Sequence, residues 1–297
     1  MSESSTPGRE RDPREGPKPP FPEQQQEAPG SDAELRPQAD HGEQSYRGCG
    51  KLEGLAAIVT GGDSGIGRAV AIAFAREGAD VLISYLDEHD DARTTAALVE
   101  SAGRRAITVA GDISELAHCG RIVDCAVSGF GRLDVVVNNA ATQSLHESFT
   151  DITDADVERI FRTNVFPVFA LCRAAIPQLP PGGAIVNSVS IQAFDPSPAL
   201  LHYAASKGAL VTFTKGLSKE LIEHGIRVNA VAPGPVWTPL IASTTSPETA
   251  ASFGKDNPTG RPAQPAELAP AYVFLASADA RFITGEVVGV TGGRFLT

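Results

Sequence analysis

The amino-acid sequence predicts an α/β protein built on a doubly wound parallel sheet. Short apolar runs typical of buried strands alternate with segments of helical pattern from residue 52 to the C-terminus. A glycine-rich turn follows the first of these runs, and polar residues follow several of the others. The chain has 297 residues, of which 42% are hydrophobic, so it is long enough to bury a large core as a single domain.

Residues 1–50 differ in composition from the domain expected at 51–297. They are rich in proline and glutamine, and Leu35 is their only Leu, Ile or Val. Such a segment buries too little apolar surface to offset its ordering entropy, so it should not fold alone. Two interpretations remain open, a disordered tail and an extended arm that lays Phe21 and Tyr46 onto a neighbouring subunit.

The folded domain begins with a strand, a turn and a helix. The apolar run at 55–59 predicts a buried strand that leads into the turn TGGDSGIG at 60–67. A helical pattern follows and ends at Gly78. Glycines let the backbone approach a phosphate, and the start of a helix offers it free N–H groups. The layout predicts a nucleotide-binding crossover of the Rossmann type, although a tight turn without a ligand has the same composition.

The alternation of strands and helices continues to the C-terminus. Further strands are expected at 81–83, 106–109, 133–137, 184–187, 226–231 and 286–290, and helices at 90–102, 115–129, 153–178, 202–224 and 266–277. Pro167 is a candidate for a kink in the long helix at 153–178. The segment 237–253, rich in Pro, Thr and Ser, is expected to be a loop with Trp237, Leu240 and Ile241 as candidate pocket residues.

Polar residues are expected to gather at one edge of this sheet, where ligands bind beyond the carboxyl ends of the strands. Those that directly follow strands are the turn at 60–67, Asp112, Asn138, Asn139, Ser190 and Pro233-Gly234. Tyr203 and Lys207 lie on the helix after the fifth strand and can point into the same crevice. This convergence predicts a functional site.

Tyr203 and Lys207 are four residues apart, which places both side chains on one helix face. An ammonium beside a phenol favours the phenolate, so it lowers the tyrosine pKa from its reference value of about 10. A tyrosine tuned toward neutral pH can donate or accept a proton in catalysis. The same spacing occurs on ordinary solvated helix faces, so the pair gains weight only from the residues around it.

Composition excludes several other classes of protein. The net charge of −11 argues against nucleic-acid binding through phosphate neutralisation. The sequence has no apolar run of membrane-spanning length and no apolar core near its start, so neither a membrane partner nor a secretory signal is expected. The four cysteines form no Cys-x-x-Cys pair and indicate buried, reduced thiols in a cytoplasmic protein. No His-Glu-x-x-His or comparable cluster occurs, so no metal is expected.

On these motifs, residues 52–297 resemble the short-chain dehydrogenase/reductase family. The glycine motif of the family matches the turn at 60–67, and its Pro-Gly after strand six matches 233–234. Its Asn-Asn-Ala-Gly motif matches 138–140, with Ala141 in place of the glycine, which leaves slightly less room beside the cofactor. The Pro-rich leader and the turn together resemble a subgroup of bacterial reductases, some described as general-stress proteins.

The resemblance implies an oxidoreductase that moves hydride between a nicotinamide cofactor and a small alcohol or carbonyl substrate. Tyr203 would be the proton donor or acceptor, and Ser190, thirteen residues earlier, would hydrogen-bond the substrate oxygen. Lys207 would lower the Tyr203 pKa and hold the ribose, and Asn164 would order a water linking Lys207 to solvent. The cofactor-binding residues that it implies are Gly61, Ser64, Gly65, Ile66, Gly67, Tyr85, Asp112, Ile113, Asn139, Ala140, Tyr203, Lys207, Pro233, Gly234, Val236 and Thr238. It also implies a homotetramer in which the helices at 153–178 and 202–224 pair across interfaces.

The cofactor is expected to be NADP or NAD. At the end of the second strand an acidic residue selects NAD, whereas a base there or in the glycine turn selects NADP. The deciding strand position is Tyr85, followed by Leu86, and the turn position is Ser64, so neither selecting residue is present. We therefore expect both cofactors to be accepted, with a slight lean to NADP because the excluding acid is missing.

A second function class remains open, a non-catalytic nucleotide-binding regulatory or scaffold protein on the same fold. The complete set of Asn164, Ser190, Tyr203 and Lys207 favours the enzyme, because a non-catalytic relative would be expected to lose one of them.

Overall fold

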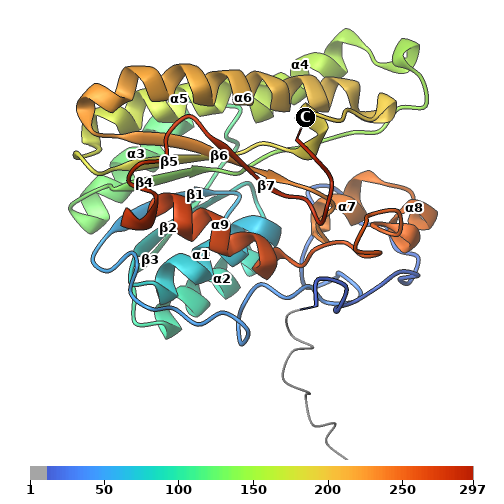
Figure 1. Cartoon of the computed structure of the whole chain (residues 1–297), viewed down its shortest axis with the longest axis horizontal. Helices are drawn as coiled ribbons and strands as arrows, with labels where there is room; N and C mark the ends of the chain where they lie inside the picture. The colour runs from blue at the N-terminus through green and yellow to red at the C-terminus, as the bar shows by residue number, and fades with distance from the viewer. Residues whose placement is uncertain (1–11, 297) are drawn as a thin grey trace, which may run out of the picture.

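The computed structural model describes residues 12–296 and confirms the predicted fold class (Figure 1). Within these residues the strands form one seven-stranded sheet in the order β3-β2-β1-β4-β5-β6-β7, and every neighbouring pair is parallel. The strands are β1 (Ala56–Thr60), β2 (Asp80–Tyr85), β3 (Ala106–Ala110), β4 (Val135–Asn138), β5 (Ala184–Ser188), β6 (Arg227–Pro233) and β7 (Val287–Val290). The strand order reverses between β1 and β4, which is where such sheets bind ligands.

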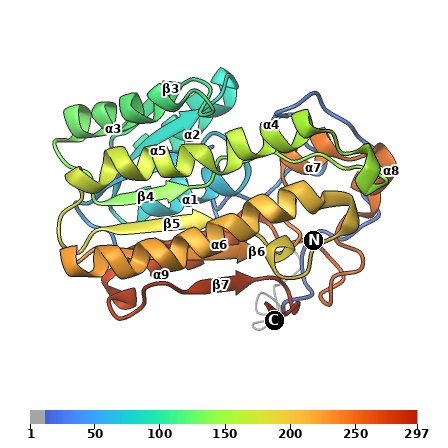
Figure 2. The same ribbon diagram turned by 90° about the horizontal axis from the view of Figure 1, so that it is seen from above.

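Helices cover both faces of the sheet (Figures 1 and 2). They are α1 (Gly65–Arg76), α2 (His89–Ser101), α3 (Leu116–Phe130), α4 (Asp154–Asn164), α5 (Phe166–Ala175), α6 (Leu201–Leu221), α7 (Pro239–Thr244), α8 (Pro247–Ser252) and α9 (Pro265–Ala276). One hydrophobic cluster joins α1 and α9 to the sheet, and a second joins α3, α5 and α6 to it. The short helices α7 and α8 replace the loop expected at 237–253.

The alternation of side chains along each strand explains why the strands read as continuous apolar runs. In β1, Ala57 and Val59 belong to the cluster with α1 and α9, whereas Ala56 and Ile58 belong to the cluster with α3, α5 and α6. Both faces of the strand are therefore buried, as expected for a parallel sheet covered by helices on both sides.

The long helix predicted at 153–178 is divided into α4 and α5, followed by a 3-10 turn at Ile176–Gln178. Val165 separates the two helices, and Pro167 lies in the first turn of α5. Proline lacks the N–H that a continuous helix needs and crowds the preceding turn. The Val168 amide donates to the Val165 carbonyl (3.1 Å), one residue short of the ordinary helical pairing with Asn164. Pro167 therefore accompanies a break rather than a kink.

Residues 12–50, which we call the arm, extend over the same chain. Phe21 packs on Trp237 with ring centroids 4.4 Å apart, and the Trp237 indole donates to the Pro37 carbonyl (2.9 Å). Leu35 is fully buried. The Tyr46 hydroxyl donates to Glu77 at the end of α1 (2.5 Å). For residues 12–50 the interpretation as a disordered tail is therefore wrong. Phe21 and Tyr46 contact the domain of their own chain, whereas the alternative interpretation placed them on a neighbouring subunit.

Two smaller expectations also need correction. Cys119 and Cys172 are buried free thiols as predicted, but Cys49 and Cys125 are exposed because they lie on the arm and on the outer side of α3. Trp237 does not line the pocket, because the arm covers it. Among residues 12–296, no helix combines the length and the apolar character needed to cross a membrane.

Candidate functional site

A cavity of about 830 Å³ opens at the carboxyl edge of the sheet, where the strand order reverses. Its volume lies in the range of small-molecule and cofactor sites. The predicted cofactor-binding residues that line it are Gly61, Ser64, Gly65, Ile66, Tyr85, Asp112, Ile113, Asn139, Ala140, Tyr203, Lys207, Pro233, Gly234, Val236 and Thr238. Gly67 lies just behind this wall, where a Cβ atom would stand 1.8 Å from the Gly61 carbonyl oxygen.

The glycine turn has the geometry of a phosphate cradle. Gly61 and Gly65 have φ values of 60° and 50°, which side chains rarely permit. Ser64 is the N-cap of α1, but its side chain makes no capping hydrogen bond, so the first amides of the helix depend on other acceptors. An anion in the cavity would face the amide of Ile66 and the positive end of the helix dipole. The turn therefore fits the pyrophosphate of a nicotinamide dinucleotide.

A chain of hydrogen bonds connects this turn to α6 across the sheet edge. The Thr60 hydroxyl accepts from the amides of Asn139 (2.9 Å) and Ala140 (3.0 Å). The Ser188 hydroxyl donates to the Asn139 side chain (3.1 Å). The Lys207 ammonium donates to the Ser188 carbonyl (2.8 Å). Residues from β1, β5, α6 and the segment after β4 are thus held in one rigid arrangement.

Tyr203, Ser190 and Lys207 lie together on the wall of the cavity. The Ser190 side chain hydrogen-bonds that of Tyr203 and also accepts from the Gln192 amide (3.1 Å). The Lys207 ammonium lies 5.6 Å from the centre of the Tyr203 ring. The structure therefore brings three of the four predicted catalytic residues together on one wall of the cavity.

The electrostatics of this pair differ from the sequence-based expectation. Burial raises the pKa of Tyr203 to about 12, against the opposing effect of the Ser190 hydrogen bond. Burial also lowers the pKa of Lys207 to about 8. The expected tuning of the tyrosine pKa toward neutral pH is wrong for this arrangement, because desolvation, which disfavours the charged forms of both groups, is the largest effect. Tyr203 therefore keeps its proton at neutral pH and is suited to donate it.

Asn164 is buried at the end of α4 and does not line the cavity. Its side chain accepts from the Thr142 amide (2.8 Å) and donates to the Thr142 carbonyl (2.9 Å). It also donates to the Ser206 hydroxyl on α6 (3.1 Å). These bonds hold the segment after β4 against α6, and its role in ordering a water stays a prediction.

Sequence reasoning missed several residues that build the site. Ala28 and Pro29 of the arm line the cavity, and Asp32 of the arm reaches the start of α1. The buried Tyr272 hydroxyl lies 2.6 Å from the hydroxyl of Ser188, whose carbonyl accepts from Lys207. These contacts join residues far apart in the sequence, so no local pattern signals them. Within residues 12–296, no group of three or more His, Cys, Asp or Glu residues is arranged to hold a metal ion.

Comparison with known proteins finds similar sequences over most of the chain. The family model described as enoyl-(acyl carrier protein) reductase matches residues 61–294. General stress protein 39 of Bacillus subtilis is 46% identical over 273 residues, which cover 92% of this chain and 96% of that protein. Glucose and ribitol dehydrogenase of Daucus carota is 45% identical over 283 residues, with 93% and 97% coverage.

Solved structures show the same fold. The 3-ketoacyl-(acyl-carrier-protein) reductase of Brucella melitensis complexed with NADH has a TM-score of 0.74 and 35% identity, covering 82% of this chain and 99% of that one. A short-chain dehydrogenase of Burkholderia cenocepacia in complex with NADP has a TM-score of 0.74 and 32% identity, covering 82% and 98%. With these matches and a cavity lined by the turn, Tyr203 and Lys207, the chain belongs to the short-chain dehydrogenase/reductase family of oxidoreductases.

Proposed function

We propose that this oxidoreductase transfers hydride between NAD(P) and a small alcohol or its aldehyde or ketone, with Tyr203 exchanging the proton. The observation that carries the proposal is the shared cavity. The hydroxyl-bearing pair Tyr203 and Ser190 opens into the same space as the glycine turn at 60–67. A dinucleotide with its phosphates at the start of α1 can therefore bring its nicotinamide ring close to a substrate carbonyl beside Tyr203.

Each residue has a defined task in the reductive direction. When bound, the nicotinamide cofactor supplies the hydride to the carbonyl carbon. Tyr203 gives its hydroxyl proton to the carbonyl oxygen, and the high pKa that burial imposes keeps this proton in place until the oxygen becomes basic. Ser190 accepts from Gln192 and so keeps its own hydroxyl proton for the substrate oxygen. Lys207, still mostly protonated at neutral pH, stabilises the phenolate left behind.

The substrate is proposed to be a small polyhydroxy compound. Gln143, Gln192 and Thr244 line the same cavity as Tyr203, where Gln143 donates to the Thr244 hydroxyl (2.9 Å) and Gln192 accepts from the Ser197 amide (2.6 Å). Buried polar groups favour ligands that can pair with them. The relative from Daucus carota is named for glucose and ribitol, which have this character.

Both nicotinamide cofactors are proposed to be accepted. Tyr85 and Leu86 line the cavity where the adenosine ribose is expected, and neither can repel or pair with a 2′-phosphate by charge. The slight lean to NADP stays a prediction, and Asp63 and Glu88 in the same wall oppose it. Relatives of known structure hold NADH in one case and NADP in another.

The protein is further proposed to be a cytoplasmic homotetramer. Large apolar side chains stand exposed on the helices that were expected to pair, with Val157 on α4 and Phe166 and Phe169 on α5. Exposed apolar surface of this kind is typical of subunit interfaces. Light scattering of the purified protein measures the assembly directly.

The test of the function is consumption of NADH or NADPH, followed by absorbance, against a panel of aldoses, ketoses and simple aldehydes. Tyr203→Phe should keep cofactor binding and lose about 10²–10⁴ in turnover, because only the acidic hydroxyl is removed. Ser190→Ala should lose about 10²–10³. Tyr46→Phe, which removes a hydroxyl bonded to Glu77 outside the cavity, is the matched control.

Retention of more than about a tenth of the activity by Tyr203→Phe would show the proton assignment to be wrong. Cofactor binding without turnover on the whole panel would favour the regulatory or scaffold alternative.

A further inference from the structure

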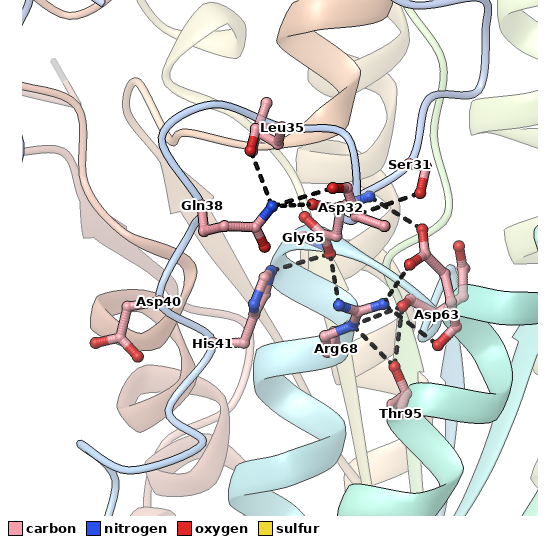
Figure 3. A network of polar contacts seen from close by, with 12 residues as sticks. Ser31, Asp32, Leu35, Gln38, Asp40, His41, Asp63, Gly65, Arg68 and Thr95 are labelled. Carbon is pink, nitrogen blue, oxygen red and sulfur yellow. Dashed lines mark hydrogen bonds and ion pairs between the residues drawn. The ribbon is translucent and has the colours of Figure 1, made fainter.

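A buried ionic cluster joins the arm to the start of α1 (Figure 3). The Asp32 side chain is only 1% exposed. Its Oδ2 atom accepts a hydrogen bond from the Gly65 amide (2.9 Å) and lies 3.0 Å from His41 Nε2 and 3.4 Å from Arg68 Nη1. A carboxylate from a residue 33 positions earlier in the chain thus meets the first amide of the phosphate-binding helix.

Arg68, which lies beside Asp32, also contacts the glycine turn and α2. Its Nε atom donates to the Asp63 carbonyl (2.8 Å) and to the Thr95 hydroxyl (3.0 Å). Its Nη2 atom pairs with Asp91 Oδ1 on α2 (2.8 Å). Asp32 therefore holds the amide of residue 65 directly and faces the cation that holds the carbonyl of residue 63. Residues 63–65 all line the cofactor cavity.

The start of α1 needs such an acceptor because Ser64 does not cap it. Asp32 does not itself line the cavity, so it binds the Gly65 amide from behind the turn. The next amide, that of Ile66, is left to face a phosphate in the cavity. The arm thus satisfies one helix-start donor and leaves the neighbouring donor for the ligand.

The partners of Asp32 in the cluster stabilise its negative charge. Burial by itself would raise its pKa, but His41, Arg68 and the Gly65 amide together hold the pKa below its usual value. Burial likewise opposes the charging of His41, yet Asp32 and Glu43 raise the His41 pKa to about 9. Asp32 is therefore ionised and His41 protonated at neutral pH, and their opposite charges lie next to one another.

The arm has a second anchor on α7, whose residues also line the cavity. The Ser243 hydroxyl of α7 donates to the Pro29 carbonyl (3.1 Å), and the Gln26 amide donates to the Ala242 carbonyl (2.9 Å). Ala28 and Pro29, which belong to this part of the arm, line the cavity themselves. Residues 26–32 therefore bridge the glycine turn and the helix that borders the substrate side.

We propose that Asp32 is a positioning residue of the cofactor site, which fixes residues 63–65 in the conformation that receives the phosphates. The arm would then form part of the cofactor site, which it also lines through Ala28 and Pro29. The proposal rests on the function proposed above, since it requires a nicotinamide dinucleotide on α1. The proposal concerns the affinity for the cofactor and not the chemical step, because Asp32 does not line the cavity in which the reaction would take place.

The test is a fluorescence titration of the full-length protein with NADH and with NADPH, well below the unfolding temperature of each variant. Asp32→Ala should raise Kd for both cofactors about tenfold, while kcat at saturating cofactor changes less than about threefold. Asp32→Asn keeps an oxygen that can accept from Gly65 and should fall between Asp32→Ala and the wild type. Glu43→Gln is the matched control, because it removes a carboxylate that contacts His41 on the arm but does not reach the turn.

The outcomes separate the two proposals. A wild-type protein that binds neither NADH nor NADPH would overturn the proposed function itself. Binding by the wild type together with an unchanged Kd in Asp32→Ala, accompanied only by a lower unfolding temperature, would reduce Asp32 to a structural residue. Tighter binding by Asp32→Asn than by the wild type would show that the carboxylate repels the phosphates, which also overturns the proposal. If Asp32→Ala does not fold, the comparison of Asp32→Asn with Glu43→Gln decides the question.

Discussion

Replacing Arg68 by methionine tests whether the cluster beneath the glycine turn stabilises the fold. Methionine keeps an unbranched apolar stem in place of the arginine stem but removes the guanidinium. Arg68 is 6% exposed, and its partners Asp32 and Asp91 are 1% and 5% exposed. The substitution therefore removes the cation that the buried carboxylates of Asp32 and Asp91 share, and leaves His41 beside Asp32 as the remaining cation of the cluster.

The expected loss of stability follows from this burial. Removing one partner of a buried ion pair costs about 3–5 kcal/mol, because the other charge stays buried without compensation. The Asp63 carbonyl also loses the Arg68 donor but keeps the Thr95 hydroxyl (2.9 Å), so this bond adds little. We expect Arg68→Met to lower the free energy of unfolding by about 3 kcal/mol at pH 7.

The loss of unfolding free energy caused by Arg68→Met should become smaller as the pH falls. In the wild type the pKa of Asp32 is lowered by folding, so its contribution is present above the pKa of the unfolded chain, about 3.9, and disappears on acidification. In Arg68→Met the Asp32 carboxylate loses one of the groups that lower its pKa, so it can take up a proton at higher pH, which relieves the uncompensated charge. The difference between the two proteins should therefore be smaller at pH 5 than at pH 7.

Urea unfolding at one fixed protein concentration measures this difference, with the fluorescence of the single, fully buried Trp237 as the signal. Arg162→Met is the matched control. Its guanidinium lies 2.8 Å from Glu158, but the two side chains are 57% and 61% exposed. Pairs this exposed contribute about 0–1 kcal/mol. A loss below about 1 kcal/mol in Arg68→Met would refute the reasoning, since it would mean that water already screens the cluster.

Two further predictions concern the reaction. Because burial lowers the pKa of Lys207 to about 8, its charge is lost as the pH rises through that value, so kcat/KM for reduction should fall above about pH 8. Lys207→Met should be slow and lack this break, whereas a break that survives in the variant would belong to another group. Tyr85→Asp places a carboxylate where the adenosine ribose is expected and should shift the ratio of kcat/KM values toward NAD. An unchanged ratio would mean that the ribose lies elsewhere, and a wild-type preference above about a thousandfold for either cofactor would mean that another residue selects it.

The fold and much of the candidate site could be predicted because their signals are local. The apolar run at 55–59, the glycine turn at 60–67 and the spacing of Tyr203 and Lys207 each lie within a few residues. A strand that is buried on both faces must be apolar throughout, and the parallel sheet then brings the residues after each strand to one edge. The sequence by itself therefore determined the α/β class, the position of the cavity and the predicted cofactor-binding residues in its wall.

The tertiary structure alone decided how those residues are charged and what surrounds them. The Tyr203 pKa depends on burial, which is a sum over neighbours from several elements and not a property of its helix. The arm was expected to be disordered or to reach another subunit, yet its few apolar side chains find partners on the same chain, such as Trp237 for Phe21. Asp32 and Gly65 meet only because the folded domain places the uncapped start of α1 and the buried Arg68 next to the arm, where the Asp32 carboxylate can contact both. Contacts of this kind leave no local pattern, because they depend on which surfaces the fold brings together.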